Sequence, residues 1–282
     1  MALPAPFVII AVGALAAGAS GLVGSFLVLR RMTMLGDAIS HAVLPGIALA
    51  FLLTGSRAAP VMVLGAALCG LLTAYAVQTL QRAGVQEDAG MGVTFTALFA
   101  LGVVLITAFA GRVHLDLDHV LYGEIAYAPW DLWLVGDVSL GPRALWTMGA
   151  IFLLDLLAVV LFFKELKFCA FDPATAEALG INVSAFHYLL MTLVSITTVG
   201  AFDAVGAILV VAMLVLPGAT AYLLTERLST MLALAVGLGA LASVLGYLLA
   251  RITDTAVAGA MAVVGGVLFA LVFWWARRRR RG

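Results

Sequence analysis

Long apolar runs, separated by short polar breaks, occupy almost the whole chain. Nine runs of about 18–25 residues can be delimited, and none shows the alternation of period two that marks a half-buried strand. They cover 7–29, 35–54, 58–80, 91–111, 145–163, 182–201, 205–224, 231–250 and 256–275. Because about 20 apolar residues in a helix cross the hydrocarbon core of a bilayer, the pattern predicts about nine transmembrane helices. The expected fold class is an all-α integral membrane protein, with residues 1–282 forming a single transmembrane domain.

The composition agrees with this fold class. Of the 282 residues, 64% are hydrophobic and 11% are charged, and the mean hydropathy is +1.16, whereas a soluble domain is about half apolar and a quarter charged. The net charge is zero, so no basic surface for nucleic acid is indicated. Cys69 lies in an apolar run and Cys169 in a polar loop, so no disulfide between them is expected. No positive charge precedes Arg30, and we therefore interpret the first run as a retained helix rather than a cleaved signal peptide.

The basic residues are distributed unequally between the two sets of loops. If the N-terminus is outside, most of the 15 Lys and Arg residues fall on the cytoplasmic side, namely Arg30, Arg31, Arg82, Lys164, Lys167, Arg227 and the run Arg277 to Arg281. The opposite loops hold Arg57, Arg112, Arg143 and Arg251. The positive-inside rule then predicts an external N-terminus and a cytoplasmic C-terminus, with 276–282 as a basic tail that anchors the topology.

The second run carries two groups that are costly inside a membrane. Asp37 and His41 stand four positions apart, so in a helix they share one face, with their Cβ atoms roughly 5–6 Å apart. An Asp at the centre of an inserting helix costs about 2.5–3.5 kcal/mol. One carboxylate and one imidazole on the same face form half of a divalent-metal site. The alternative interpretation is that Asp37 caps the helix and that His41 packs against a neighbouring helix.

The loop over 112–141, predicted to be external, is too long for a bare turn. Leu115 to Tyr122 has helix-like apolar spacing, and Trp130 and Trp133 suit the headgroup level, so we expect a short interfacial helix. The candidate metal ligands of this loop are His114, Asp116, Asp118 and His119. We favour a solvated acidic loop over a metal cluster, and its charge would steer cations towards the entrance.

The polar loop after the fifth run contains a short helix signal over 171–181. Asp172 is expected to act as the N-cap, Pro173 occupies the first helical position, and Gly180 ends the helix. This helix is either a well-capped connector or a docking element for a cytoplasmic partner.

Other positions interrupt the apolar runs. Pro217, followed by Gly218, predicts a kink or break in the seventh run, which serves either a transport pathway or helix packing. Asp155 is expected to pair with another polar group or to face a cavity, and His187 to form a hydrogen bond within the bundle. The chain contains no GxxxxGK[ST], HExxH or GxSxG motif, so it is not expected to be an enzyme.

Several segments resemble, in order, the motifs of one known family. They are Arg30-Arg31-Met32 with Gly36-Asp37-Ala38-Ile39-Ser40-His41-Ala42-Val43-Leu44-Pro45-Gly46, Leu121-Tyr122-Gly123-Glu124-Ile125, Phe171-Asp172-Pro173 with Ala176 and Leu179-Gly180-Ile181, Val205-Gly206-Ala207 with Leu216-Pro217-Gly218-Ala219-Thr220-Ala221, and Asp254-Thr255. The chain thereby resembles the permeases of ATP-binding-cassette importers for zinc, manganese and iron. The resemblance extends over nearly the whole chain, with one departure at Ala256, where the family often has a proline.

The resemblance implies the fold of importers for metals and metal chelates, the type II fold, and also the rest of the transport complex. Two permease copies, expected to be a homodimer, would form the pore in the bacterial cytoplasmic membrane. Two cytoplasmic ATP-binding subunits would dock below, and an extracytoplasmic metal-binding protein would deliver the ion. The pathway residues of the family carry over onto Asp37 and His41. Its coupling segment carries over onto Asp172, Pro173, Ala176, Leu179 and Gly180.

The metal would be transported cargo, so no permanently bound cofactor is implied. Two copies each of Asp37 and His41 would provide a mixed oxygen and nitrogen set suited to Mn²⁺, Fe²⁺ or Zn²⁺. Binding must be weak enough for release. The continuation Ala42-Val43-Leu44-Pro45-Gly46 resembles the manganese and iron branch more than the zinc branch, so manganese is the favoured cargo. The alternative function is a proton-coupled secondary transporter of divalent cations that uses Asp37 and His41 as a proton relay.

Overall fold

The computed structural model describes residues 4–55, 59–109, 125–135 and 138–279. Apart from one β-hairpin, the elements of this part of the chain are helices, so the predicted all-α class is confirmed. In chain order they are α1 (Ala5–Leu29), α2 (Thr33–Thr54), α3 (Ala59–Arg82), α4 (Glu87–Phe109), β1 (Leu132–Val135), β2 (Val138–Pro142), α6 (Arg143–Leu161), α7 (Phe163–Phe171), α8 (Pro173–Ala178), α9 (Val183–Val205), α10 (Ala207–Leu224), α11 (Leu228–Thr253) and α12 (Val257–Arg279).

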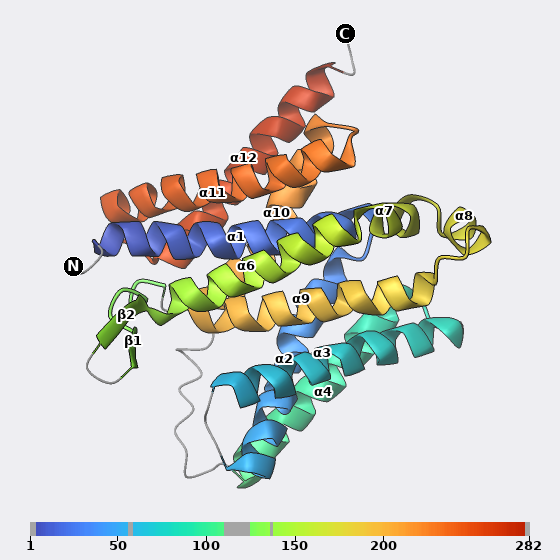
Figure 1. The fold of residues 1–282 in the computed structure, drawn as a ribbon, viewed down its shortest axis with the longest axis horizontal. Helices are drawn as coiled ribbons and strands as arrows, with labels where there is room; N and C mark the ends of the chain where they lie inside the picture. Colours follow the sequence, from blue (N-terminus) through green and yellow to red (C-terminus); the bar gives the residue numbers. More distant parts are fainter. Residues whose placement is uncertain (1–3, 56–58, 110–124, 136–137, 280–282) are drawn as a thin grey trace.

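Each of the nine apolar runs of the sequence corresponds to one long helix of the structure (Figure 1). Within the described residues, eight helices are long and apolar enough to cross a membrane: α1, α2, α3, α4, α6, α9, α11 and α12. Helix α10 is apolar but shorter. The chain is therefore a multi-pass membrane protein.

Helix α1 lies at the centre of the larger group of helices. It packs against α6, α9, α10 and α11, and Figure 1 shows it running between α6 and α11. A Cβ atom on Gly24 would overlap the backbone carbonyl oxygen of Leu214 on α10, and one on Gly239 of α11 would lie 2.8 Å from the Cβ atom of Ala17. Glycine at these two positions lets the backbones approach closely, which is how helices pack tightly in lipid.

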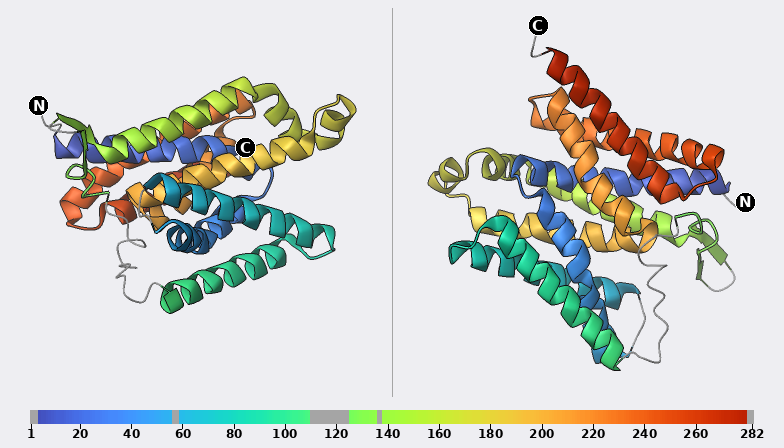
Figure 2. Two further views of the ribbon diagram at one scale, coloured as in Figure 1. Left: turned by 60° about the horizontal axis from the view of Figure 1, so that its bottom comes forward. Right: turned by 180° about the vertical axis from the view of Figure 1, so that it is seen from behind.

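Helices α2, α3 and α4 form a second group, seen below the first in Figure 1 and from two other sides in Figure 2. Helix α2 packs mainly against α3 and α4, and it also contacts α9 and α10 of the larger group. A Cβ atom on Gly46 would overlap the carbonyl oxygen of Gly65 on α3. A Cβ atom on Gly102 of α4 would lie 2.8 Å from the backbone nitrogen of Pro45. The middle of α2 is thus held between two closely approaching backbones.

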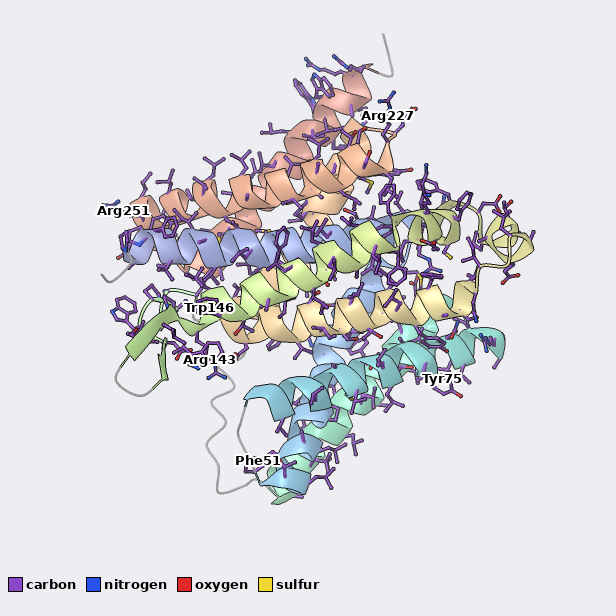
Figure 3. All side chains as sticks on the ribbon, in the orientation of Figure 1. Phe51, Tyr75, Arg143, Trp146, Arg227 and Arg251 are labelled. Carbon is purple, nitrogen blue, oxygen red and sulfur yellow. The ribbon has the colours of Figure 1, made fainter. Side chains whose placement is uncertain are left out.

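The connecting elements gather at the two ends of the bundle. Figure 1 shows the hairpin β1–β2 and the N-terminus at one end, and α7, α8 and the C-terminus towards the other. In Figure 3, Arg143 and Arg251 lie at the hairpin end, whereas Arg227 lies towards the end with α7 and α8. Arg227 is therefore separated in space from Arg143 and Arg251, which were assigned to the opposite side of the membrane.

Two of the connecting elements were not predicted. Strands β1 and β2 form an antiparallel hairpin in which Leu132 pairs with Pro142 and Val135 with Val138, where a loop was expected. Helix α7 occupies a stretch that was expected to be a polar loop. The predicted interfacial helix over Leu115 to Tyr122 lies outside the described residues.

Helix α10 is continuous through its proline, where a kink or a break was predicted. The helix continues from Ala207 to Leu224 with Pro217 inside it, so the break that the sequence allowed at this residue is not present. The chain instead breaks at Gly206, which separates α9 from α10 and has a φ of +82°. Glycine reaches this region of φ without the steric cost that a side chain would bring.

Candidate functional site

The candidate site lies in the first half of α2. Asp37 and His41 are both inside this helix, and its N-cap is Met32, which makes no side-chain capping hydrogen bond. The interpretation of Asp37 as the helix cap is therefore wrong. The Nε2 atom of His41 lies 3.6 Å from the Oδ1 atom of Asp37, and these side chains are 42% and 40% exposed. The two groups face the same side, close enough to share a cation, and both remain accessible.

Two aromatic rings of α4 hold the imidazole of His41. The ring centroid of Phe95 lies 5.7 Å from that of His41 at an interplanar angle of 34°, and the ring of Phe99 meets it edge-on at 6.2 Å. Contacts of this geometry favour a fixed ring orientation. His41 thus does pack against a neighbouring helix, as the alternative interpretation proposed, but it also keeps its Nε2 atom beside a carboxylate.

The backbone of α2 is irregular beside the site, because Pro45 lies inside the helix. A proline has no backbone N–H, so Pro45 cannot donate to the carbonyl oxygen of His41, four residues earlier. This carbonyl lies outside the regular hydrogen-bond ladder, next to the Asp37–His41 pair. The sequence analysis quoted Pro45 within a motif but gave it no structural role, although a proline inside an apolar run is a visible signal.

One chain supplies only part of a coordination set. Within the described residues, no group of three or more His, Cys, Asp and Glu side chains is placed to hold a metal ion. Four ligands is the usual number at a closed zinc site, and six or more at an oxygen-rich one. The pair on α2 is therefore half a site or less. The other predicted ligand cluster, formed by His114, Asp116, Asp118 and His119, lies outside the described residues.

Helix α10 touches the beginning of α2 but does so through an apolar residue. Leu214 packs so closely against Gly36, the neighbour of Asp37, that a Cβ atom there would overlap its side chain. Gly218 lies against α1, where a Cβ atom would come within 3.2 Å of the backbone of Ser25. The described contacts place Gly218, and with it the Pro217 segment, in the packing between α10 and α1.

Two polar residues inside the bundle have the partners that were expected of them. The hydroxyl of Thr197 on α9 donates to the carboxylate of Asp155 on α6. Arg30, directly after α1, places a guanidinium nitrogen 3.3 Å from the Nδ1 atom of His187. The first pair joins two helices and the second joins the end of α1 to α9, so both stabilise the packing and stand apart from the Asp37–His41 pair.

The short capped segment over 171–181 has the predicted form. Asp172 caps α8, since one of its carboxylate oxygens accepts from the backbone N–H of Thr175 at 3.0 Å and the other from the hydroxyl of the same residue. Hydrogen bonds from Thr175 lower the pKa of Asp172. Pro173 begins the helix, and Gly180, with a φ of +80°, follows its end.

The two apolar residues of this segment differ in their exposure. Ala176 is fully buried against the chain itself, whereas Leu179 is 62% exposed. Leu179 can therefore contact a partner directly, while Ala176 supports the shape of the segment from beneath.

The fold and the site together define a polytopic membrane transporter with a polar pair inside a spanning helix. The model of the ABC 3 transport family matches residues 6–276, and the chain belongs to this family. It is 50% identical over 265 residues to the manganese transport system membrane protein MntD of Bacillus subtilis, covering 94% of this chain and 90% of the relative. It is 46% identical over 256 residues to the zinc transport system membrane protein TroD of Treponema pallidum, covering 90% and 70%.

Solved structures agree with the family. The chain aligns with a chain of PsaBC from Streptococcus pneumoniae in complex with Fab, with a TM-score of 0.78 and 34% identity over 95% of this chain and 90% of the other. A metal-chelate type ABC transporter in an inward-facing conformation aligns with a TM-score of 0.61 and 17% identity, covering 94% and 84%. The second likeness concerns the fold alone.

Proposed function

We propose that this chain is the membrane permease of an ATP-driven importer of divalent transition-metal ions, with manganese as the favoured cargo and zinc or iron as alternatives. The observation that carries the proposal is the Asp37–His41 pair, whose Nε2 and Oδ1 atoms lie 3.6 Å apart on an accessible face of a spanning helix. A carboxylate and an imidazole are ligands that Mn²⁺, Fe²⁺ and Zn²⁺ all accept.

The pair is suited to passing an ion on rather than to keeping it. Two ligands from one chain give weak binding, and a transport site must release its ion as well as bind it. In a homodimer, two copies of Asp37 and His41 facing one pathway would provide two carboxylates and two imidazoles.

The energy would come from a separate subunit. The family consists of ABC transporters, which favours ATP-driven import over the proton-coupled alternative. We assign the docking of two cytoplasmic ATP-binding subunits to the α8 segment, where Leu179 offers an exposed apolar side chain. An extracytoplasmic metal-binding protein would deliver the ion at the opposite end of the bundle. No permanently bound cofactor is proposed, because the metal is the cargo.

The orientation and the cargo follow from separate arguments. The positive-inside rule supports an external N-terminus and a cytoplasmic C-terminus in the bacterial cytoplasmic membrane, and the basic last turn of α12, Arg277 to Arg279, supports the same orientation. The relatives named above transport manganese in one case and zinc in the other. Manganese is favoured because the more similar of these two relatives is named for it and because the second-run motif resembles the manganese branch.

Uptake of radioactive manganese by the assembled importer, reconstituted in vesicles with ATP inside, tests the proposal. Loss of a residue that only supports a metal ligand costs roughly 10–100-fold. Asp37→Asn and His41→Gln each remove a proposed ligand itself, so each should reduce uptake by at least that factor. The matched control is Asp88→Asn, which removes an exposed carboxylate from the first turn of α4. Co-purification of the ATP-binding subunit should be unchanged in all three variants. Normal uptake by both site variants would refute the assignment of the pair.

A further inference from the structure

A groove runs along the side of the larger helix group, between α6 and α11. Its volume is about 950 Å³, and it is lined by Leu156 and Val160 of α6, Leu232 and Val236 of α11, and Leu22 of α1. Leu22 is only 3% exposed and forms the base of the groove, whereas Val160 is 65% exposed at its edge. Figure 1 shows the same arrangement of ribbons, with α1 running between α6 and α11. All three walls belong to membrane-spanning helices.

The groove becomes polar at one end. There it is lined by Lys164, Glu165 and Ser229. A second cavity of about 390 Å³ shares Phe163 and Ser229 with the groove. The two cavities therefore adjoin at these two residues, and together they make a depression that is apolar along the spanning helices and polar where α6 ends and α11 begins. The polar residues that the second cavity adds are Lys167, Glu226 and Arg227.

The polar end carries positive charges without anionic partners. Lys164, Lys167 and Arg227 are exposed, and none of them forms an ion pair within the described part of the chain. The cations outnumber the carboxylates of Glu165 and Glu226 at this end. The first turn of α11 points its backbone N–H groups the same way, and the partial positive charge of a helix N-terminus adds to the field. An anionic group is the complement of this end of the depression.

We propose that the depression binds one anionic phospholipid, with an acyl chain in the apolar groove and the phosphate at Lys164, Lys167 and Arg227. The wall of α11 from Ser229 to Val236 extends over about 10 Å, which is long enough to hold the upper part of an acyl chain. Basic pockets between spanning helices on the cytoplasmic side of a membrane recognise anionic headgroups in this way. The volume lies within the range of about 300–1,000 Å³ that is typical of small-molecule sites.

Two other occupants explain only part of these observations. A second copy of the chain could cover the apolar groove, but a two-fold contact there would bring the same uncompensated cations of both copies towards each other. The ATP-binding subunit could reach the polar end, but it cannot enter a groove that lies within the membrane. The leaflet assignment rests on the orientation proposed above, whereas lipid binding can be measured independently of metal import.

The test uses the permease purified with its ATP-binding subunit, stripped of lipid by detergent and then exposed to vesicles of phosphatidylglycerol or of phosphatidylcholine. Bound lipid is counted by native mass spectrometry. The wild-type complex should retain phosphatidylglycerol in preference to phosphatidylcholine. Replacement of Lys164 and Arg227 by Ser should reduce that preference by about fivefold for each cation. Arg251→Ser, at the opposite end of α11, is the matched control and should leave the preference unchanged.

A second pair of variants tests the apolar groove. Val160→Trp fills it and should reduce the retention of both lipids, whereas Leu157→Trp should not, because Leu157 is 64% exposed on the same helix and does not line the groove. Equal retention of the two lipids by the wild type, or equal behaviour of the two Trp variants, would overturn the proposal. It would also be overturned if Val160→Cys formed a disulfide between two copies, or if the Ser replacements released the ATP-binding subunit without changing the lipid.

Discussion

The hydroxyl of Thr197 lies 2.6 Å from the Oδ2 atom of Asp155 and donates a hydrogen bond to it between α9 and α6. Both side chains are fully buried, and the second carboxylate oxygen of Asp155 has no hydrogen-bond partner among the described residues. A buried polar group with too few partners is expensive in a bundle surrounded by lipid. The single bond from Thr197 is therefore an important contribution to the packing of these two helices.

We predict that Thr197→Val destabilises the complex by about 1–3 kcal/mol, because it leaves the carboxyl group without a partner. The control is Thr192→Val on the same helix, whose hydroxyl bonds only to the carbonyl oxygen of Tyr188 in its own helix. Combining Thr197→Val with Asp155→Leu should recover most of the loss, since two apolar groups leave nothing unsatisfied. Thermal unfolding of the wild type and these three variants in detergent measures the loss and its recovery, and equal effects of Thr197→Val and Thr192→Val would contradict the prediction.

The contact between α4 and α2 should depend on a single glycine. A Cβ atom on Gly102 would lie 2.8 Å from the backbone nitrogen of Pro45 and 2.9 Å from its ring. Gly102→Ala should push α4 away from α2 and disturb the edge-on contact of Phe99 with His41, so we expect manganese uptake to fall by about tenfold, the factor that corresponds to roughly 1.4 kcal/mol.

Helix α4 provides its own control for this effect. Gly92 has no atom within 4 Å of the position that a Cβ atom would take, so Gly92→Ala should keep uptake normal and stabilise the helix by up to about 1 kcal/mol. Uptake and thermal unfolding should be measured on both variants in parallel. If both alanines leave uptake unchanged, the α4 contact does not position the site.

The sequence was sufficient to predict the helices and the polar pair, because both depend on local patterns. An apolar run of about 20 residues has few stable structures in lipid other than a helix, and a spacing of four places Asp37 and His41 on one face whatever surrounds them. The cap of α8 was predictable for the same reason, since Asp172 and Thr175 are three residues apart and their bond is local.

The features that sequence reasoning missed depend on packing between distant segments. Phe95 and Phe99 lie one helical turn apart on α4, but nothing in that spacing shows that the ring of His41 lies against them. Helix α7 was missed because Phe and Lys alternate irregularly over its nine residues, and its burial against neighbouring elements, at Leu166 and Cys169, supports the helix. The continuity of α10 through Pro217 likewise reflects its contacts with α1 and α12 rather than its local propensity.

The two cysteines of the chain are free and buried, and Cys169 of α7 should be unreactive in the folded complex. Its side chain is 2% exposed. Burial raises the pKa of the Cys169 thiol above its ordinary value, an effect that the nearby Arg30 guanidinium only partly offsets. Because the thiolate is the reactive form, the protonated thiol should react with iodoacetamide at neutral pH at least about tenfold more slowly than an exposed one.

Peptide mass spectrometry after a timed reaction measures this difference. A Gln86→Cys variant supplies the exposed reference thiol, because Gln86 is exposed in the connection between α3 and α4, and denatured protein supplies the fully reactive limit. The modification of Cys169 should become faster as the pH rises towards the raised pKa. Similar rates for Cys169 and the reference thiol at neutral pH would show that α7 opens readily.

Two variants should impair the docking role proposed for the α8 segment in distinguishable ways. Leu179→Arg changes an exposed side chain, so it should release the ATP-binding subunit without altering thermal unfolding. Asp172→Ala removes the cap at Thr175, so it should weaken α8 itself and reduce docking as a consequence. Glu177→Ala, at an exposed position of the same helix, is the control and should do neither.

The effect of pH separates the cap from other contributions to docking. The pKa of Asp172 is lowered in the folded state by its hydrogen bonds with Thr175. The cap therefore stabilises α8 fully above the ordinary Asp pKa of 3.8, and this stabilisation is lost as the pH falls through the lowered folded value. Between weakly acidic and neutral pH the cap is fully formed. Co-purification of the ATP-binding subunit with the wild-type permease should therefore not vary over this range on account of Asp172. If the wild-type permease lost the subunit within this range and Asp172→Ala showed no such pH dependence, Asp172 would not be an ionised cap.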